Sequence, residues 1–269
     1  MSSSPSKFQI KRFVERLRET MPRLRFQEQT LGHVGEHPIL VYTRKAFDPD
    51  SKETIEPKAR IFISAGVHGD EPAPPLAIIR MASENRFRAD VEWTIFPALN
   101  PSGLEVGTRE NAEGVDLNRD YKTRQTYEVR CQTRYIESLP VDQPNWDLAI
   151  CLHEDYDTAG FYLYQVDDTE IASTICRHVI VRTSEFMEIE PGSEIDGMPA
   201  ENGIINPLEV YPDIHQSRPD LPEAAYLFKN FATRTYTLET PSSAYIETRI
   251  STQVAAALGA IETVCSENT

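Results

Sequence analysis

The chain has 269 residues, of which 40% are hydrophobic and 26% are charged, and its formal net charge is −15 at pH 7. A chain of this length can bury a substantial core, but its acidity argues against nucleic acid or an anionic membrane as a partner, because their phosphates would repel it. No apolar run approaches the roughly 18 residues that a membrane-spanning helix needs. The polar amino terminus has no signal-peptide core, so we expect a cytoplasmic location.

Hydrophobic periodicity and turn-forming residues divide the chain into alternating strands and helices. In chain order, the sequence predicts a helix over residues 5–19, strands over 39–43 and 60–67, a helix over 72–85, a strand over 91–98, a turn at 100–103, a polar loop over 107–122, a helix over 127–138, strands over 146–152 and 160–165, a helix over 169–182, loops with short extended pieces over 183–220, a strand over 234–238, and a last helix from Ser242 or Ser243 to Val264.

Strands that alternate with helices favour a sheet that is covered by helices on both faces. We therefore expect a three-layer α/β/α fold with a central mixed, mostly parallel sheet. No internal repeat, low-complexity tract or long linker divides the chain, so residues 1–269 are expected to form a single domain. The first helix, within residues 1–25, is expected to pack on it.

Polar side chains follow several of the predicted strands. His68 and Glu71 come directly after one apolar run, and His153 ends another. Asn100 and Glu239 follow two further strands. Because ligands of open α/β sheets bind at the carboxyl ends of the strands, we expect these five residues to converge along one edge of the sheet.

Two imidazoles and one carboxylate are a ligand set that leaves zinc an open fourth position for water or substrate. His68, Glu71 and His153 supply those groups, so the sequence predicts a site for one Zn2+ ion and the chemistry of a zinc hydrolase. The four cysteines form no Cys-x-x-Cys pair, which leaves a four-thiolate zinc site without support.

An asparagine and two arginines stand in the polar loop before the helix predicted over residues 127–138. Asn118 and Arg119 together offer amide donors and a planar guanidinium fork, which suit the recognition of a carboxylate. Arg109 is close enough in sequence to line the same pocket, where one arginine can bind a substrate carboxylate while the other stabilises a developing oxyanion. The alternative is that both arginines only neutralise acidic neighbours on a solvated loop.

The ordered set His-x-x-Glu, Asn-Pro-x-Gly, Asp-Leu-Asn-Arg, a lone His and a Glu after a strand resembles the zinc carboxypeptidase superfamily. The match runs from about residue 60 to about residue 240. This superfamily includes classical metallocarboxypeptidases, the aspartoacylase and succinylglutamate desuccinylase branch, and bacterial amidases that trim cell-wall peptides. The resemblance implies their phosphorylase/hydrolase-like fold, with the three predicted ligands binding the zinc ion.

The resemblance also implies roles for four further residues. Asn118 and Arg119 match the pair that binds the terminal carboxylate of a peptide. Arg109 resembles the arginine that polarises the scissile carbonyl, although its spacing before Asn-Arg is shorter than in the digestive enzymes. Glu239, in Thr-Tyr-Thr-Leu-Glu-Thr-Pro, matches the general base that takes a proton from the attacking water and passes it to the leaving amine.

Two features depart from the pattern of that superfamily. Classical members use a tyrosine on a mobile loop before the catalytic glutamate; Tyr211 and Tyr226 both lie in that stretch, and we take Tyr211 as the candidate for substrate binding. The acidic run Glu154-Asp155-Tyr-Asp follows His153. It can orient the imidazole, form a second cation site, select a basic substrate group, or simply be a solvated loop.

The sequence therefore predicts a zinc-dependent hydrolase that cleaves an amide bond next to a free carboxylate, with a small peptide as substrate. The Thr-Leu-Glu-Thr-Pro context of Glu239 resembles the peptidase branch of the superfamily. The alternatives are a deacylase of N-acyl amino acids, a cell-wall peptide amidase and, from a different class, a non-catalytic member that binds a peptide without turnover. The oligomeric state stays open.

Overall fold

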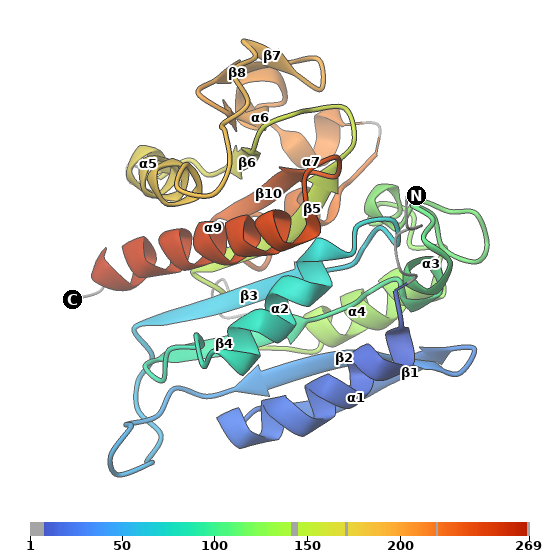
Figure 1. Ribbon diagram of the computed structural model, residues 1–269, viewed down its shortest axis with the longest axis vertical. Helices are drawn as coiled ribbons and strands as arrows, with labels where there is room; N and C mark the ends of the chain where they lie inside the picture. The colour runs from blue at the N-terminus through green and yellow to red at the C-terminus, as the bar shows by residue number, and fades with distance from the viewer. Residues whose placement is uncertain (1–7, 141–144, 170–171, 219, 268–269) are drawn as a thin grey trace.

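The computed structural model describes residues 8–140, 145–169, 172–218 and 220–267 (Figure 1). Its elements are α1 (Ile10–Thr20), the 3-10 helix η1 (Met21–Leu24), β1 (Gln27–Val34), β2 (His37–Arg44), β3 (Ala59–Ala65), α2 (Ala73–Ser83), β4 (Val91–Phe96), α3 (Pro101–Val106), the 3-10 helix η2 (Leu117–Arg119), α4 (Tyr127–Glu137), β5 (Leu148–Asp155), β6 (Tyr162–Val166), α5 (Ala172–Thr183), β7 (Glu194–Ile195), β8 (Met198–Glu201), β9 (Ile204–Ile205), α6 (Pro207–Val210), α7 (Ile214–Ser217), α8 (Glu223–Leu227), β10 (Thr235–Pro241) and α9 (Ile246–Glu267).

The strands of the described residues form one ten-stranded sheet in the order β1-β2-β4-β3-β5-β10-β6-β9-β8-β7. Its centre, β4-β3-β5-β10, is parallel. On one side β1 and β2 join antiparallel, and on the other β6 pairs antiparallel with β10. The prediction of an α/β fold with a mixed sheet is confirmed.

Alternate side chains of the central strands enter two hydrophobic cores, one on each face of the sheet. Ile61 and Ile63 of β3 pack with apolar residues of α1, α2, α5 and α9, and Figure 1 shows α1, α2 and α9 lying across that face. Phe62 and Cys151 instead pack with residues of α4 and α8. Because His153 follows Cys151 by two residues along β5, its side chain points to the α4 and α8 face.

The ends of the chain show two differences from the prediction. The first helix begins at Ile10, whereas its predicted residues 5–7 lie outside the described part of the chain. Its buried residues, Ile10, Phe13, Val14 and Leu17, have the expected helical spacing. Strand β1 was not predicted, because it is an edge strand with mostly exposed polar side chains and lacks the apolar alternation of a half-buried strand.

The predicted strand ends also shift. Strands β5 and β10 run beyond their apolar stretches, and their parallel register pairs Glu239 with His153, so both residues lie within strands. The predicted turn at Asn100 is the amino-terminal cap of α3, where the Asn100 side chain accepts a hydrogen bond from Gly103. The last helix begins at Ile246, several residues after the caps expected for it.

The segment predicted as loops over residues 183–220 contains short strands β7 to β9 and short helices α6 and α7, with residue 219 outside the described ranges. The helix predicted over 169–182 is described from Ala172 to Thr183; residues 170 and 171 lie outside those ranges. The five-residue helix α8 was not predicted, because it is too short for a periodic signal. In the described part of the chain, no helix has the length and apolar character needed to span a bilayer.

Candidate metal centre and active site

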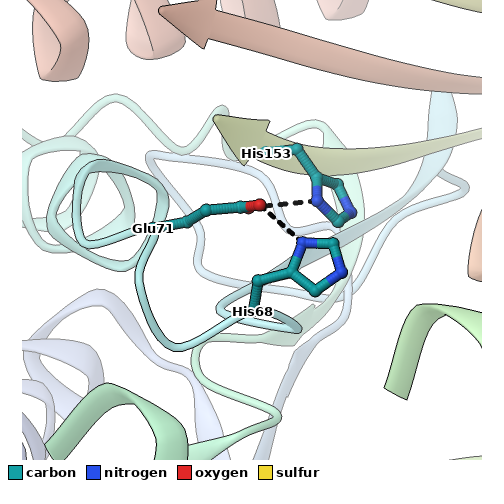
Figure 2. A group of neighbouring side chains, drawn as sticks. All are labelled: His68, Glu71 and His153. Carbon is teal, nitrogen blue, oxygen red and sulfur yellow. Dashed lines mark hydrogen bonds and ion pairs between the residues drawn. The ribbon is translucent and has the colours of Figure 1, made fainter. Parts of the chain in front are cut away.

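Two imidazoles and a carboxylate meet where the loop between β3 and α2 approaches β5 (Figure 2). One ligand atom from each of His68, Glu71 and His153 lies within 4.8 Å of the others. The carboxylate of Glu71 points between the rings: Oε1 lies 2.5 Å from Nδ1 of His68, and Oε2 lies 3.1 Å from Nδ1 of His153. The structure thus brings together the three groups that the sequence predicted as metal ligands.

The chemistry of this group fits a metal ion. Each of the three residues is at most 3% exposed. Glu71 Oε2 is buried and, although it lies 3.1 Å from His153 Nδ1, it makes no well-aligned hydrogen bond with any described residue. A buried polar atom without a partner is costly, and a cation between the two Nδ1 atoms would satisfy it. Two imidazole nitrogens and one carboxylate oxygen are the ligand set of a catalytic zinc site with an open position.

Neighbouring charged groups shift the pKa values of Glu71 and His68. Burial would raise the pKa of Glu71, but the neighbouring imidazoles of His68 and His153 lower it to about 2. Burial would lower the pKa of His68, but Glu71 and Asp116 raise it to about 9. In the metal-free protein at pH 7, His68 is therefore a cation between two carboxylates.

Asp116 is a residue of the site to which the sequence reasoning gave no role. Its Oδ1 lies 3.0 Å from His68 Nε2 and accepts a hydrogen bond from the backbone nitrogen of Asn118 at 2.8 Å. Its Oδ2 accepts a hydrogen bond from Arg109 Nε at 3.0 Å. Carboxylates that hold the second nitrogen of a metal-binding imidazole are a common feature of zinc sites. One feature of the sequence could have identified it: Asp116 is the first residue of the Asp-Leu-Asn-Arg motif, which also contains the two predicted substrate-binding residues Asn118 and Arg119.

The same cavity as the metal group is lined by three residues that were predicted to act on the substrate, Arg109, Asn118 and Arg119. The Arg109 guanidinium is partly buried, and its Nη1 lies 3.9 Å from Glu71 Oε1. The Asn118 Oδ1 accepts a hydrogen bond from the backbone nitrogen of Glu223 at 2.9 Å, so its amide nitrogen is the group left to donate. Arg119 is exposed, and its Nε lies 2.7 Å from a carboxylate oxygen of Asp220.

Glu239 lies beside His153 on the neighbouring parallel strand and also lines the cavity. It is 8% exposed, and its Oε2 has no hydrogen-bond partner in the described residues. Burial raises the pKa of Glu239 to about 8, although the charge of His153 partly opposes that shift. A buried carboxyl group with a raised pKa next to a metal group is suited to proton transfer near neutral pH.

The cavity has a volume of about 710 Å³. Its wall also includes Tyr162 and Tyr164 of β6, and the Tyr164 hydroxyl donates to Asp196 at 3.0 Å. Tyr211 is not among the described residues that line this cavity; the Arg218 guanidinium, which is among them, lies 5.2 Å from the centre of the Tyr211 ring. A substrate contact by Tyr211 therefore stays a prediction.

Two further residues of the sequence analysis have structural partners. Glu154 is buried, with one oxygen bonded to Arg249 and the other to the backbone nitrogen of Ala73, so neither is left for a second cation. Asn100 is also buried, and it donates to the backbone oxygen of Arg109 at 3.3 Å. It supports the loop that carries Arg109 rather than lining the cavity.

Comparison with known proteins adds family information to this geometry. Residues 57–182 match the succinylglutamate desuccinylase/aspartoacylase catalytic domain. A stretch of 87 residues is 33% identical to murein peptide amidase A of Vibrio campbellii and covers 32% of this chain and 35% of that protein. Another of 83 residues is 34% identical to carboxypeptidase SOL1 of Arabidopsis thaliana and covers 27% of this chain and 17% of that protein. The matches thus span about a third or less of these relatives.

The fold has close counterparts among solved structures. A proposed metallopeptidase from Shewanella amazonensis superposes with a TM-score of 0.79 at 22% identity, over 96% of this chain and 94% of that one. This likeness confirms the predicted fold. The sequence matches, each over less than half of the chain, agree with the resemblance to the zinc carboxypeptidase superfamily that the motifs indicated.

Proposed function

We propose that the protein is a zinc-dependent hydrolase that cleaves an amide bond next to a free carboxylate, as a carboxypeptidase does. The observation that carries this proposal is the convergence of His68, Glu71 and His153 beside Glu239 in one cavity that Arg109 also lines. These groups supply a metal site, a proton acceptor and a cation for developing negative charge, which are the requirements of metal-assisted amide hydrolysis.

The metal group, Glu239 and Arg109 each have a role in this chemistry. A zinc ion bound to the three ligands would lower the pKa of a bound water to about 7. A cation bound beside Glu239 would favour its ionised form. The carboxylate can then accept the proton of the attacking water and return it to the leaving amine, because it is the buried carboxyl group beside His153 with an unpartnered oxygen. Arg109 lies where its guanidinium can stabilise the oxyanion that forms on the carbonyl.

Recognition of the substrate carboxylate falls to Asn118 and Arg119. The hydrogen bond from the Glu223 backbone to Asn118 Oδ1 leaves the Asn118 amide nitrogen as a donor. Arg119 is exposed beside it. Its Nε pairs with Asp220 and its Nη1 donates to the backbone oxygen of Asn118 at 3.1 Å, so Nη2 is the nitrogen that can bind a second anion. A planar guanidinium and an amide donor together favour a carboxylate over a neutral terminus.

A second candidate is a deacylase of N-acyl amino acids. It is favoured by the match of residues 57–182 to the succinylglutamate desuccinylase/aspartoacylase catalytic domain. The partial match to murein peptide amidase A keeps a cell-wall peptide amidase among the candidates. All three reactions use the same metal group and differ in the acyl part of the substrate.

Hydrolysis of matched substrates tests the proposal. The zinc-loaded protein is incubated with four kinds of substrate: short peptides that carry a free terminal carboxylate, the same peptides as terminal amides, N-acyl amino acids, and cell-wall muropeptides. Mass spectrometry identifies the products. We expect release of the last residue from the free peptides and little reaction of the amides. Equal cleavage of free and amidated peptides would contradict carboxylate recognition, and cleavage of N-acyl amino acids alone would favour the deacylase. No turnover of any substrate would contradict a hydrolase.

A further inference from the structure

The carboxy-terminal helix α9 contacts the backbone of the candidate active site from the opposite face of the sheet. Gln253 donates through Nε2 to the backbone oxygen of His153 at 2.5 Å and to the hydroxyl of Thr240 at 3.1 Å. The same nitrogen lies 3.3 Å from the backbone oxygen of Leu238, the residue before Glu239. One side chain of α9 is therefore bonded to both strands that carry the polar groups of the cavity.

A second side chain of α9 is linked through Glu154 to the loop that carries the other metal ligands. Arg249 stands one helical turn before Gln253, and its Nη1 lies 2.5 Å from Glu154 Oε1. The other oxygen of Glu154 accepts a hydrogen bond from the backbone nitrogen of Ala73 at 2.9 Å. Ala73 is the first residue of α2 and follows Glu71 by two positions, so Glu154 connects strand β5 to the Glu71 loop.

The side chains that make these contacts between α9 and the site are buried. The Glu154 side chain is 0% exposed and that of Arg249 is 12% exposed, and Gln253 is fully buried. Water therefore does not compete for these bonds, and each buried polar group depends on its partner. Along β5, alternation directs His153 to the cavity and Glu154 to α9. The backbone at this point is fixed from both faces of the sheet.

We propose that Arg249 and Gln253 of α9 position the metal ligands of this protein, Arg249 through Glu154 and Gln253 through the His153 backbone. The proposal rests on the metal site in the proposed function. His68 and Glu71 come from a loop, whereas His153 comes from a strand more than 80 residues later. A metal requires its ligand atoms within about 0.2 Å of the preferred distances, and the α9 contacts hold the loop and the strand in one arrangement.

Zinc affinity is the measurement that tests this positioning role. Glu154→Gln removes the charge that pairs with Arg249, and Gln253→Met keeps the length of the side chain but removes its donor. We expect each variant to bind zinc about tenfold more weakly or worse, the range found for residues that support metal ligands. Arg249→Lys can keep the ion pair and should stay close to the parent affinity. The matched control is Glu262→Gln, which removes an ion pair between α9 and Arg182 of α5.

Dissociation constants are measured by chelator competition, below the melting temperature of each metal-free variant. A purely structural role would lower that melting temperature and leave the zinc dissociation constant of the folded protein unchanged. Dissociation constants within twofold of the parent in Glu154→Gln and Gln253→Met would therefore overturn the proposal. If one of these variants does not fold, the dissociation constant of the other alone decides the test. If the parent binds zinc and hydrolyses peptides under those conditions, only the positioning role fails. If the parent binds no zinc, both proposals fail.

Discussion

Asp116 and His68 are joined by a 3.0 Å contact between the carboxylate Oδ1 and the imidazole Nε2. Burial would raise the pKa of Asp116, but His68 and Arg109 hold it well below its usual range, so the carboxylate is ionised. An ionised carboxylate can only accept a hydrogen bond, which makes Nε2 the donor. The Nδ1 atom, which faces Glu71, is then the nitrogen available to a metal ion.

Asp116→Asn is expected to weaken zinc binding about 10-fold to 100-fold, because the amide no longer supplies the charge that holds the His68 ring. The substitution keeps an oxygen that can accept from the Asn118 backbone, so the local turn should persist. Chelator competition measures the affinity. Asp90→Asn, which affects an ion pair with Arg88 away from the cavity, is the control. Equal zinc affinity in Asp116→Asn and the parent would show that Asp116 does not support the ligand.

Zinc binding is expected to release at least one proton at pH 7, the proton held by His68. The raised pKa of His68, about 9, means that the metal-free imidazole is protonated, whereas a metal ligand must be neutral. Apparent affinity should therefore rise with pH, by about tenfold per unit while one proton is exchanged, and level off near pH 9. Calorimetry in buffers of different ionisation enthalpy counts the protons. Binding without proton release at pH 7 would contradict this charge assignment.

Glu239→Gln should retain zinc and lose at least about 100-fold in kcat, because the amide cannot accept the proton of the attacking water. Metal analysis and kinetics on the same preparation separate the two effects. A variant that keeps both zinc and turnover would remove Glu239 from the mechanism. It would also favour a different residue of the cavity as the base.

Arg119→Ala is expected to lower kcat/KM about 10-fold to 100-fold on peptides with a free terminal carboxylate, because a hydrogen bond to a charged group contributes about 1.5–3 kcal/mol. The same variant should have little effect on the slow reaction of amidated peptides. Arg12→Ala, on the exposed side of α1, controls for the loss of a surface charge. An equal loss on both kinds of peptide would indicate that Arg119 acts on the fold rather than on the carboxylate.

Much of the fold could be predicted because its central strands are buried on both faces and its helices are amphipathic. Strand β3 and helix α1 both follow the apolar spacing of the sequence. The edge strand β1 and the short helix α8 could not be predicted, because neither has a periodic apolar face. The end of β5 was also not predicted. Its pairing with β10 continues through His153 and Glu239, and no local hydrophobic pattern indicates this continuation.

The candidate site was predictable where a motif fixed the residue type. His68, Glu71 and His153 were chosen for their chemistry and their places after apolar runs, and they lie together. The role of Asp116 depends on the direction of one carboxylate in a folded loop, which spacing does not encode. The partners of Glu154 could not be predicted from spacing either. Arg249 is 95 positions away, and only the packing of α9 brings the two side chains into contact.

Anomalous diffraction at the zinc edge, from crystals of the zinc-loaded protein, is the most direct test of the proposed metal site. We predict one ion per chain, bound by Nδ1 of His68, Nδ1 of His153 and the carboxylate of Glu71 at about 2.0–2.2 Å. An ion bound by other residues, or no ordered ion beside these three side chains, would contradict the proposed zinc site and with it the proposed hydrolase.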